Sequence, residues 1–356
     1  MNLQKLSDIV DLLKGKKPEI STNSDGNLPY LTAKYIRGVS DPEYGIPSSK
    51  GSVLVTPNDY VIIMDGSNSG EVFTGLNGIL ASTMGKIVLK EKINLKYLGY
   101  FLESNKELFA STKTGSAIPH LSKEVFFNLD IAIPSLQEQE KIVERLDKIF
   151  TTLEAKRKTN TFLIIKLKHL INSKINKDFH GQKNIEKTVN FTDAVEVINK
   201  DSVKKRDYLE SGKYPIVAQE KFLINGYTNN NKNIIKSPIP LIGFGDHTKV
   251  VKFLNFPFVK GADGLKVLKV NQDILPKYFY WWLKGLNLRN LGYARHFKLL
   301  KKYRIEVIPL KNQKEAIKNI DELAKNIAKI IENYQKLNKN IDLLKKSVLN
   351  KEFSYE

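Results

Sequence analysis

Residues 133–146 read Ile-Pro-Ser-Leu-Gln-Glu-Gln-Glu-Lys-Ile-Val-Glu-Arg-Leu, and residues 308–320 read Ile-Pro-Leu-Lys-Asn-Gln-Lys-Glu-Ala-Ile-Lys-Asn-Ile. These stretches open two copies of one segment, which stay aligned at a constant offset of 174 residues from Gln139 onward. The copies still correspond at their far ends, where Ser-Lys-Ile-Asn-Lys-Asp-Phe at 173–179 matches Ser-Val-Leu-Asn-Lys-Glu-Phe at 347–353. A gap-free match of this length indicates an internal duplication.

Each copy predicts one long helix with an apolar seam. Residues 135–179 contain neither Pro nor Gly, and Pro134 precedes them at a position that a helix tolerates. Apolar side chains recur at alternating spacings of three and four, which is typical of a coiled coil. Since such a helix is roughly 65 Å long at 1.5 Å per residue, we expect the copies to pack antiparallel; a compact helical bundle is the alternative. The predicted seam consists of Val143, Leu146, Phe150, Leu153, Ile164 and Leu167 in the first copy, and Ile317, Ile320, Ile327, Ile331, Ile341 and Val348 in the second.

The segments before the two helices have a different texture. Residues 1–132 and 183–307 are rich in Gly, Pro, Asn and Tyr, with short apolar runs between turn signals. Such runs predict strands, with a helix or two among them. We therefore expect an α+β chain with a pseudo-twofold internal repeat. Two mixed α/β domains, at 1–132 and 183–307, are separated by two long antiparallel coiled-coil helices, the central one within 133–182 and the C-terminal one within 308–356.

The two mixed α/β domains also correspond to each other, more loosely than the helices do. The apolar runs predict strands at 61–64, 86–89 and 239–242, and helices at 97–106 and 278–284. The matched segments pair 7–8 with 192–193, 26–29 with 212–215, 81–86 with 260–265, and 115–117 with 292–294.

Composition narrows the classes of function. The 356 residues carry a net charge of +19, which favours a polyanionic partner such as nucleic acid. Lysine supplies most of this excess, and an AT-rich genome produces the same bias, so charge alone does not decide. The absence of cysteine excludes disulfides, thiolate catalysis and cysteine zinc sites, and it fits a reducing cytoplasm. With no membrane-length apolar run and no signal-peptide pattern at the N-terminus, we expect a cytoplasmic protein.

Basic side chains beside glycine-marked turns are the candidate DNA contacts. Arg and Lys pair with guanine in the major groove and Asn pairs with adenine, so these residue types suit base recognition. The alternative is that they only solvate loops. The predicted DNA-binding residues are Lys34, Arg37, Lys113 and His120 in the first domain, and Arg289, Arg295, His296 and Lys298 in the second.

No motif for catalysis stands out. The sequence lacks the glycine-rich cofactor turn and the Asn/Asp-Pro-Pro-aromatic run of DNA methyltransferases, and it has no Gly-x-x-x-x-Gly-Lys-Ser/Thr loop for ATP. Glu154 and Lys156 have a nuclease-like spacing but fall in the predicted helix. Gly245-Asp246-His247 resembles a site, although a turn with a surface histidine explains it better. We therefore expect no catalytic residue, no metal and no bound cofactor on this chain.

Three stretches resemble the specificity subunits of type I restriction-modification systems. They are Thr-Gly-Ser-Ala-Ile-Pro-His-Leu-Ser at 114–122, Ile-Ala-Ile-Pro-Ser-Leu-Gln-Glu-Gln-Glu-Lys-Ile-Val at 131–143, and Leu-Lys-Lys-Ser-Val-Leu-Asn-Lys-Glu-Phe-Ser at 344–354. The chain departs from the family in being short, and its second copy has lost a residue near 310.

The resemblance implies a DNA-binding subunit that reads a bipartite, asymmetric site in double-stranded DNA, one half per recognition domain. The paired helices would set the gap and dock two modification (methyltransferase) subunits, which restriction (motor and nuclease) subunits join. S-adenosylmethionine, ATP and Mg would belong to those partners. Two rival hypotheses remain open, a self-sufficient DNA-modifying enzyme and a basic coiled-coil scaffold.

Overall fold

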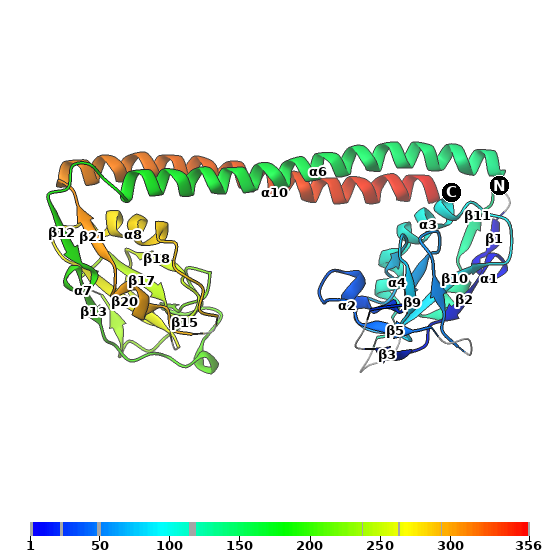
Figure 1. The fold of residues 1–356 in the computed structure, drawn as a ribbon, viewed down its shortest axis with the longest axis horizontal. Helices are drawn as coiled ribbons and strands as arrows, with labels where there is room; N and C mark the ends of the chain where they lie inside the picture. The colour runs from blue at the N-terminus through cyan, green and yellow to red at the C-terminus, as the bar shows by residue number, and fades with distance from the viewer. Residues whose placement is uncertain are drawn as a thin grey trace. The chain divides into compact units, whose positions relative to one another are not determined.

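The computed structural model describes residues 3–21, 24–47, 51–113, 119–236, 238–262, 264–292 and 294–354. The chain divides into two compact units. Unit 1 comprises Met1–Thr159 with Leu337–Glu356, and unit 2 comprises Asn160–Lys336. The two long helices, α6 (Leu136–Phe179) and α10 (Leu310–Phe353), each contribute one part to each unit (Figure 1).

Unit 1 contains a four-stranded sheet of order β2-β10-β7-β8, a five-stranded sheet of order β3-β5-β4-β9-β6, and the pair β1-β11. Its strands are β1 (Leu3–Lys5), β2 (Val10–Lys14), β3 (Glu19–Ser21), β4 (Leu28–Leu31), β5 (Tyr44–Ile46), β6 (Leu54–Val55), β7 (Val61–Ile63), β8 (Val72–Phe73), β9 (Gly78–Leu80), β10 (Met84–Leu89) and β11 (Asp130–Ala132). Its shorter helices are α1 (Leu6–Ile9), α2 (Ala33–Ile36), α3 (Leu95–Ser104), α4 (Lys106–Ser111) and α5 (Lys123–Phe127).

Unit 2 contains two four-stranded sheets, of order β13-β20-β17-β18 and β15-β14-β19-β16, and the pair β12-β21. Its strands are β12 (Lys187–Asn190), β13 (Val195–Ile198), β14 (Tyr214–Val217), β15 (Gly226–Thr228), β16 (Ile234–Ile235), β17 (Leu241–Gly245), β18 (Val251–Leu254), β19 (Phe258–Lys260), β20 (Leu265–Val270) and β21 (Arg304–Val307). Its shorter helices are α7 (Phe191–Ala194), the 3₁₀ turn η1 (Lys205–Asp207), α8 (Pro276–Gly285) and α9 (Phe297–Leu300).

The duplication extends to strand topology. The sheet β13-β20-β17-β18 of unit 2 has the same order of equivalent strands as β2-β10-β7-β8 of unit 1. The other sheet contains one parallel contact in each unit, β4 with β9 and β14 with β19. Three of the four segment matches lie in equivalent elements: 7–8 and 192–193 in α1 and α7, 26–29 and 212–215 at β4 and β14, and 81–86 and 260–265 before and within β10 and β20. The fourth match lies outside the described residues, because 115–117 and Tyr293 are not among them.

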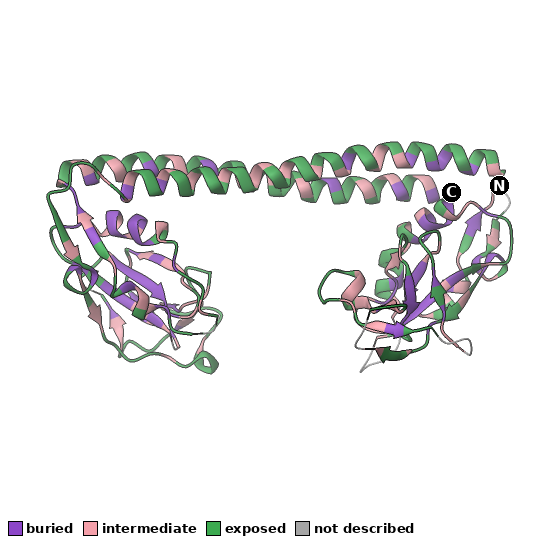
Figure 2. Cartoon of the chain, viewed as in Figure 1, coloured by how far each residue is buried: buried purple, intermediate pink, exposed green. Residues whose placement is uncertain are grey.

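Within each unit, the parts of α6 and α10 run antiparallel. In unit 1, Arg145 pairs with Glu352 at 2.6 Å, and Glu154 accepts from Lys345 at 3.2 Å, so residue numbers rise along one helix as they fall along the other. All twelve predicted seam residues are buried or half-buried. Figure 2 shows buried and half-buried positions recurring among exposed ones along both long helices. Further buried positions of the long helices were not predicted: Ile142, Leu349 and Phe353 in unit 1, and Ile175 and Phe179 in unit 2. They belong to the cores that also include residues of the shorter helices.

The core of each unit joins its sheets to the long helices through one amphipathic helix. In unit 1 this is α3, whose Tyr97 and Phe101 rings lie 5.3 and 5.8 Å from the ring of Phe353 on α10. In unit 2 it is α8, whose Tyr278 ring lies 4.9 Å from Phe179 on α6. The predicted helices at 97–106 and 278–284 correspond to α3 and α8. Both begin slightly earlier, α3 after a cap and α8 at Pro276, because proline fits the first turn of a helix.

Candidate nucleic-acid interface

In each unit, a buried glutamine joins the sheet-containing domain to one of the long helices. In unit 1 this is Gln139, in the first turn of α6 and only 1% exposed. Its side-chain oxygen accepts a hydrogen bond from the main-chain N–H of Asn94 at 2.8 Å, and its Nε2 donates to the carbonyl of Pro134 at 2.8 Å. Asn94 in turn caps α3, since its Oδ1 accepts from the N–H groups of Lys96 and Tyr97. One side chain thus ties the start of α3 to the start of α6.

Gln313, at the equivalent position of α10, does the same in unit 2 and is completely buried. It accepts from the N–H of Leu275, directly before α8, at 2.8 Å. Its Nε2 donates to the carbonyls of Asp273 at 3.0 Å and Ile308 at 2.8 Å. Because a buried main-chain group without a partner is costly, this glutamine fixes the turn before α8 on the long helix.

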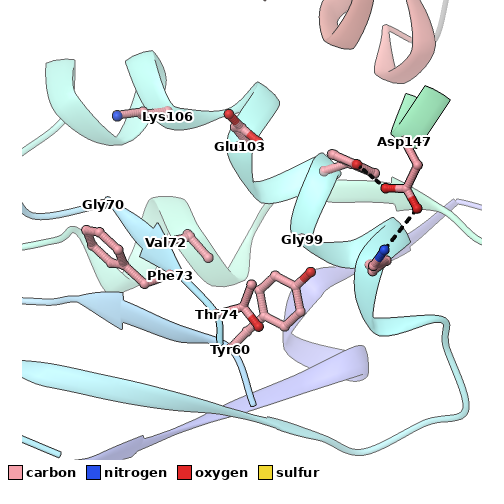
Figure 3. A pocket seen from close by; sticks show the side chains of 11 residues that line it. Tyr60, Gly70, Val72, Phe73, Thr74, Gly99, Glu103, Lys106 and Asp147 are labelled. Atoms are coloured by element: carbon pink, nitrogen blue, oxygen red, sulfur yellow. Dashed lines mark hydrogen bonds and ion pairs between the residues drawn. The ribbon is translucent and has the colours of Figure 1, made fainter. Parts of the chain in front are cut away.

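A second junction lies two turns further along α6. The Tyr100 hydroxyl donates to Asp147 at 2.5 Å, and Lys96 Nζ lies 2.9 Å from the other carboxylate oxygen (Figure 3). Burial acts to raise the pKa of Asp147, but the hydrogen bonds from Tyr100 and Lys96 outweigh it, and the pKa is lowered. The carboxylate therefore stays charged and bonds two side chains of α3, Lys96 and Tyr100, which lie one turn apart.

Asp321 forms the equivalent junction on α10. Trp281 Nε1 donates to its carboxylate at 2.8 Å, and Lys277 Nζ lies at 3.5 Å. Lys277 also sits 4.4 Å from the centroid of the Phe253 ring in β18, a cation–π contact that links α8 to the sheet. The duplication has thus kept a glutamine and an aspartate on each long helix, while the aromatic residue that bonds the aspartate is Tyr100 in unit 1 and Trp281 in unit 2.

A hollow of about 350 Å³ adjoins the Asp147 junction in unit 1 (Figure 3). Of its charged walls, Asp147 bonds to Tyr100 and Lys96, and Lys106 lies 3.8 Å from Glu71. Its lining residues are Tyr60, Gly70, Val72, Phe73, Thr74, Lys96, Gly99, Tyr100, Glu103, Lys106 and Asp147. We assign it a structural role at the junction.

The predicted DNA-binding residues of the first domain lie at two places. Lys34 lies in α2 and Arg37 directly follows it; both are exposed, and Arg37 lies 3.7 Å from Glu71. Lys113 and His120 meet the turn that follows β7. Lys113 Nζ donates to the Ser67 carbonyl at 2.6 Å, and His120 Nδ1 lies 2.8 Å from Asp65.

Asp65 holds this second group together. Burial acts to raise its pKa, but hydrogen bonds from His120 and Lys14 more than compensate, and the pKa is lowered. Lys14 Nζ lies 3.0 Å from the carboxylate. A side chain whose nitrogen is already bonded within the protein is less available to a phosphate, so His120 and Lys113 contribute to the structure of this turn.

In the second domain, Arg289, Arg295 and Lys298 are exposed. Among the described residues none of the three takes part in an ion pair, which leaves their charge available to a polyanion. His296 must be withdrawn from the predicted set, because its side chain is completely buried. Its Nδ1 lies 3.0 Å from the carbonyl oxygen of Asp246, and its Nε2 accepts from the N–H of Leu291 at 3.1 Å.

The Gly-Asp-His segment at 245–247 is a structural turn. The carboxylate of Asp246, 3% exposed, accepts from the N–H of Phe297 at 2.8 Å and so secures the start of α9. Within the described ranges, no three His, Cys, Asp or Glu side chains are placed to hold a metal ion. None of the described helices combines the length and the apolar character needed to cross a membrane.

Residues 1–162 match the family described as "Type I restriction modification DNA specificity domain". Over these residues, somewhat under half of its length, the chain is similar to this type I specificity family. Its first half carries the family match, and unit 2 repeats the topology of that half.

Three relatives of this chain are named as specificity subunits of type I restriction enzymes. Over 146 residues, 40% of this chain, it is 37% identical to the type I restriction enzyme MjaVIII specificity subunit of Methanocaldococcus jannaschii, of which the match covers 34%. Over 301 residues, 76% of this chain, it is 24% identical to the MjaIX specificity subunit of the same organism, of which the match covers 68%. Over 87 residues, 24% of this chain and 22% of the relative, it is 34% identical to the EcoR124I/EcoR124II specificity subunit of Escherichia coli.

The fold is also that of a solved structure. This chain superposes on one from a structural study of complex assembly and conformational transition of the type I R-M system. The TM-score is 0.73 at 14% sequence identity, and the match covers 98% of this chain and 96% of that one. This match confirms the predicted fold, in which mixed α/β domains are combined with long helices.

Proposed function

We propose that this chain is the sequence-specific DNA-binding subunit of a type I restriction-modification complex. In this proposal each recognition domain reads one half of a bipartite, asymmetric site, and partner subunits methylate or cleave. The observation that carries the proposal is the duplicated scaffold, in which equivalent strands and junctions support different surfaces. Because different side chains at base edges select different bases, two diverged copies are suited to two different half-sites.

The second domain offers the plainest surface for DNA. Arg289, Arg295 and Lys298 are exposed and unpaired among the described residues, so they suit phosphates or guanine edges. In the first domain we propose the same role for Lys34 and Arg37, and a lesser one for Lys113 and His120, which also hold a turn.

The partners in the proposal are double-stranded DNA, two modification subunits and the restriction subunits. S-adenosylmethionine, ATP and Mg are assigned to those subunits, and methyl transfer and cleavage take place on them. The long helices, which belong in part to each unit, would set the number of unread base pairs between the half-sites and offer a surface to the modification subunits.

Reconstitution separates this proposal from its rivals. We expect the purified chain alone to transfer no methyl group and to cut no DNA, and we expect methyl transfer to appear once the modification subunit is added. Activity that stays with the chain through successive purification steps would favour a self-sufficient enzyme. A reconstituted complex that binds every duplex at the ~10⁻⁴–10⁻⁶ M of non-specific association would favour a scaffold.

A further inference from the structure

The loop between β14 and β15 presents an unusual apolar tip. Phe222 is 75% exposed, and its neighbours Leu223 and Ile224 are 46% and 37% exposed. Three consecutive large apolar residues in water are unfavourable in a protein that acts alone, and such clusters mark binding surfaces.

The loop is held in place by a buried lysine. Lys252 in β18 is only 4% exposed. Its Nζ donates to the carbonyl of Ala218 at 2.6 Å, to the carbonyl of Phe222, and to Oδ1 of Asn225 at 3.1 Å. The same Oδ1 accepts from the N–H of Ala218 at 2.9 Å, which closes the loop on itself. The tip is thus preorganised, so its contact with a partner costs little conformational entropy.

The chemistry around the tip fits nucleic acid. Residues 221–236 contain three lysines and five asparagines, and the acidic residue of the 219–225 loop is Glu220, which directly precedes this stretch. An acidic polymer with hydrogen-bonding edges matches this setting better than a neutral protein face does, since lysines suit phosphates and amides suit bases.

Unit 1 carries a smaller tip at the equivalent place. Val39 is 74% exposed and follows β4, as the 219–225 loop follows β14. Its N–H donates to the carbonyl of Lys34 at 2.9 Å, and Gly38, at φ +68°, makes the turn with a second bond to the carbonyl of Tyr35 at 2.9 Å. The tip in unit 2 comes directly after β14 and is held by the side chains of Lys252 and Asn225. The tip in unit 1 comes after β4 and the short helix α2, and main-chain hydrogen bonds hold it.

The major groove of DNA offers one apolar group on its base edges, the 5-methyl of thymine. We propose that Phe222, and Val39 in the first domain, are specificity-determining residues that contact a thymine methyl within their respective half-sites. This inference rests on the proposed function and names the base that one residue of each domain selects.

Replacing thymine by deoxyuridine tests it, because this change deletes the methyl and keeps the base pair. We would first obtain the recognised motif from a complex of the full chain with its modification subunit, and then measure binding to duplexes with one thymine replaced at a time. At one position in the second half-site we expect about fourfold weaker binding, as the loss of one buried methyl predicts. A wild-type complex that binds every deoxyuridine duplex as tightly as thymine would overturn the proposal.

Variants at the tip assign the effect to the side chain. The Phe222→Leu complex should keep a preference for thymine. The Phe222→Asn complex should lose that preference in the second half-site, while it still requires the first half-site for methylation. Folding should be unaffected, because Lys252 bonds the main chain of residue 222 rather than its side chain. Ile185→Ala, on an exposed residue between α6 and β12, is the control and should retain full discrimination.

Val39→Asn should remove the thymine preference from the other half-site alone. If Phe222→Asn keeps both affinity and thymine preference, the tip does not read bases. If it weakens binding to all duplexes equally, with no thymine effect in the wild type, the tip acts as a wedge between base steps instead, and the proposal also fails. A complex that recognises no motif at all would refute the proposed function itself, which is a distinct result.

Discussion

Replacing the two buried glutamines by leucine tests how the recognition domains are joined to the helices. Leucine has nearly the same volume, so the change removes hydrogen bonds and leaves little cavity. Gln313→Leu leaves three main-chain groups without their hydrogen-bond partner, those of Leu275, Asp273 and Ile308. Gln139→Leu leaves two such groups, those of Asn94 and Pro134. At the lower end of about 1–3 kcal/mol per stranded group, we expect losses of about 3 kcal/mol in unit 2 and about 2 kcal/mol in unit 1.

The chain has a built-in reporter for this comparison. Its 2 tryptophans, Trp281 and Trp282, both lie in α8 of unit 2, so tryptophan fluorescence follows that unit. In urea unfolding, Gln313→Leu should move the fluorescence transition to lower denaturant, and Gln139→Leu should move mainly the circular-dichroism transition. Hydrogen exchange should show the Leu275 amide unprotected in the first variant and the Asn94 amide unprotected in the second.

The control is Gln137→Leu, because Gln137 lies one half-turn away in α6 and is exposed. It should change the free energy of unfolding by less than about 0.5 kcal/mol, as expected for a surface position. If Gln313→Leu is no more destabilising than this control and the Leu275 amide stays protected, the glutamine does not carry the junction.

Three further predictions concern acid stability, DNA contacts and the helices. Burial lowers the pKa of His180 below its usual 6.5. Because the unfolded chain binds this proton and the folded one does not, acidification below pH 6.5 should destabilise unit 2 by at most about 1.4 kcal/mol per pH unit. His180→Asn should reduce this pH dependence when unfolding is followed by fluorescence. Alanine changes at the seven remaining basic positions should weaken DNA binding by about 1–3 kcal/mol where a base contact is lost and by less at a phosphate; unchanged affinity and motif in all of them would remove the assignment of Lys34, Arg37, Lys113, His120, Arg289, Arg295 and Lys298. Four residues inserted after Lys158, with four at the facing level of α10, add about 6 Å of helix and should widen the unread gap by a base pair or two, given ~3.4 Å per pair; a stable, active variant with an unchanged gap would show that the helices do not set the spacing.

The long helices and their antiparallel pairing were predictable because both depend on a periodic pattern in a duplicated stretch. Gln139 and Gln313 were visible as matched residues, yet their role was not, because their partners are main-chain groups of Asn94 and Leu275, far away in the sequence. The same holds for Asp147, which matches Asp321 at the offset of 174 residues. This match did not reveal that Tyr100 would bond to Asp147.

The candidate site was harder to predict, since burial decides it and burial is a tertiary property. His296 stands between two basic residues and looked like one of them, but Asp246 and Leu291 enclose it. Lys252 could not be recognised as a buried residue. Nothing in its local sequence distinguishes it from a surface lysine, although three acceptors surround its amine. A signal was present for the Phe222 tip, since three apolar residues in a stretch rich in Lys and Asn do not fit a solvated loop.

The central claim is that two diverged copies of one fold read two different half-sites. Its most direct test is to map methylated motifs in the DNA of a host that expresses this chain with its modification subunit, beside the same host without the chain. The account predicts a chain-dependent motif in two unlike parts, separated by a fixed number of unread base pairs. A continuous motif, a perfect palindrome, or methylation that does not depend on the chain would contradict it.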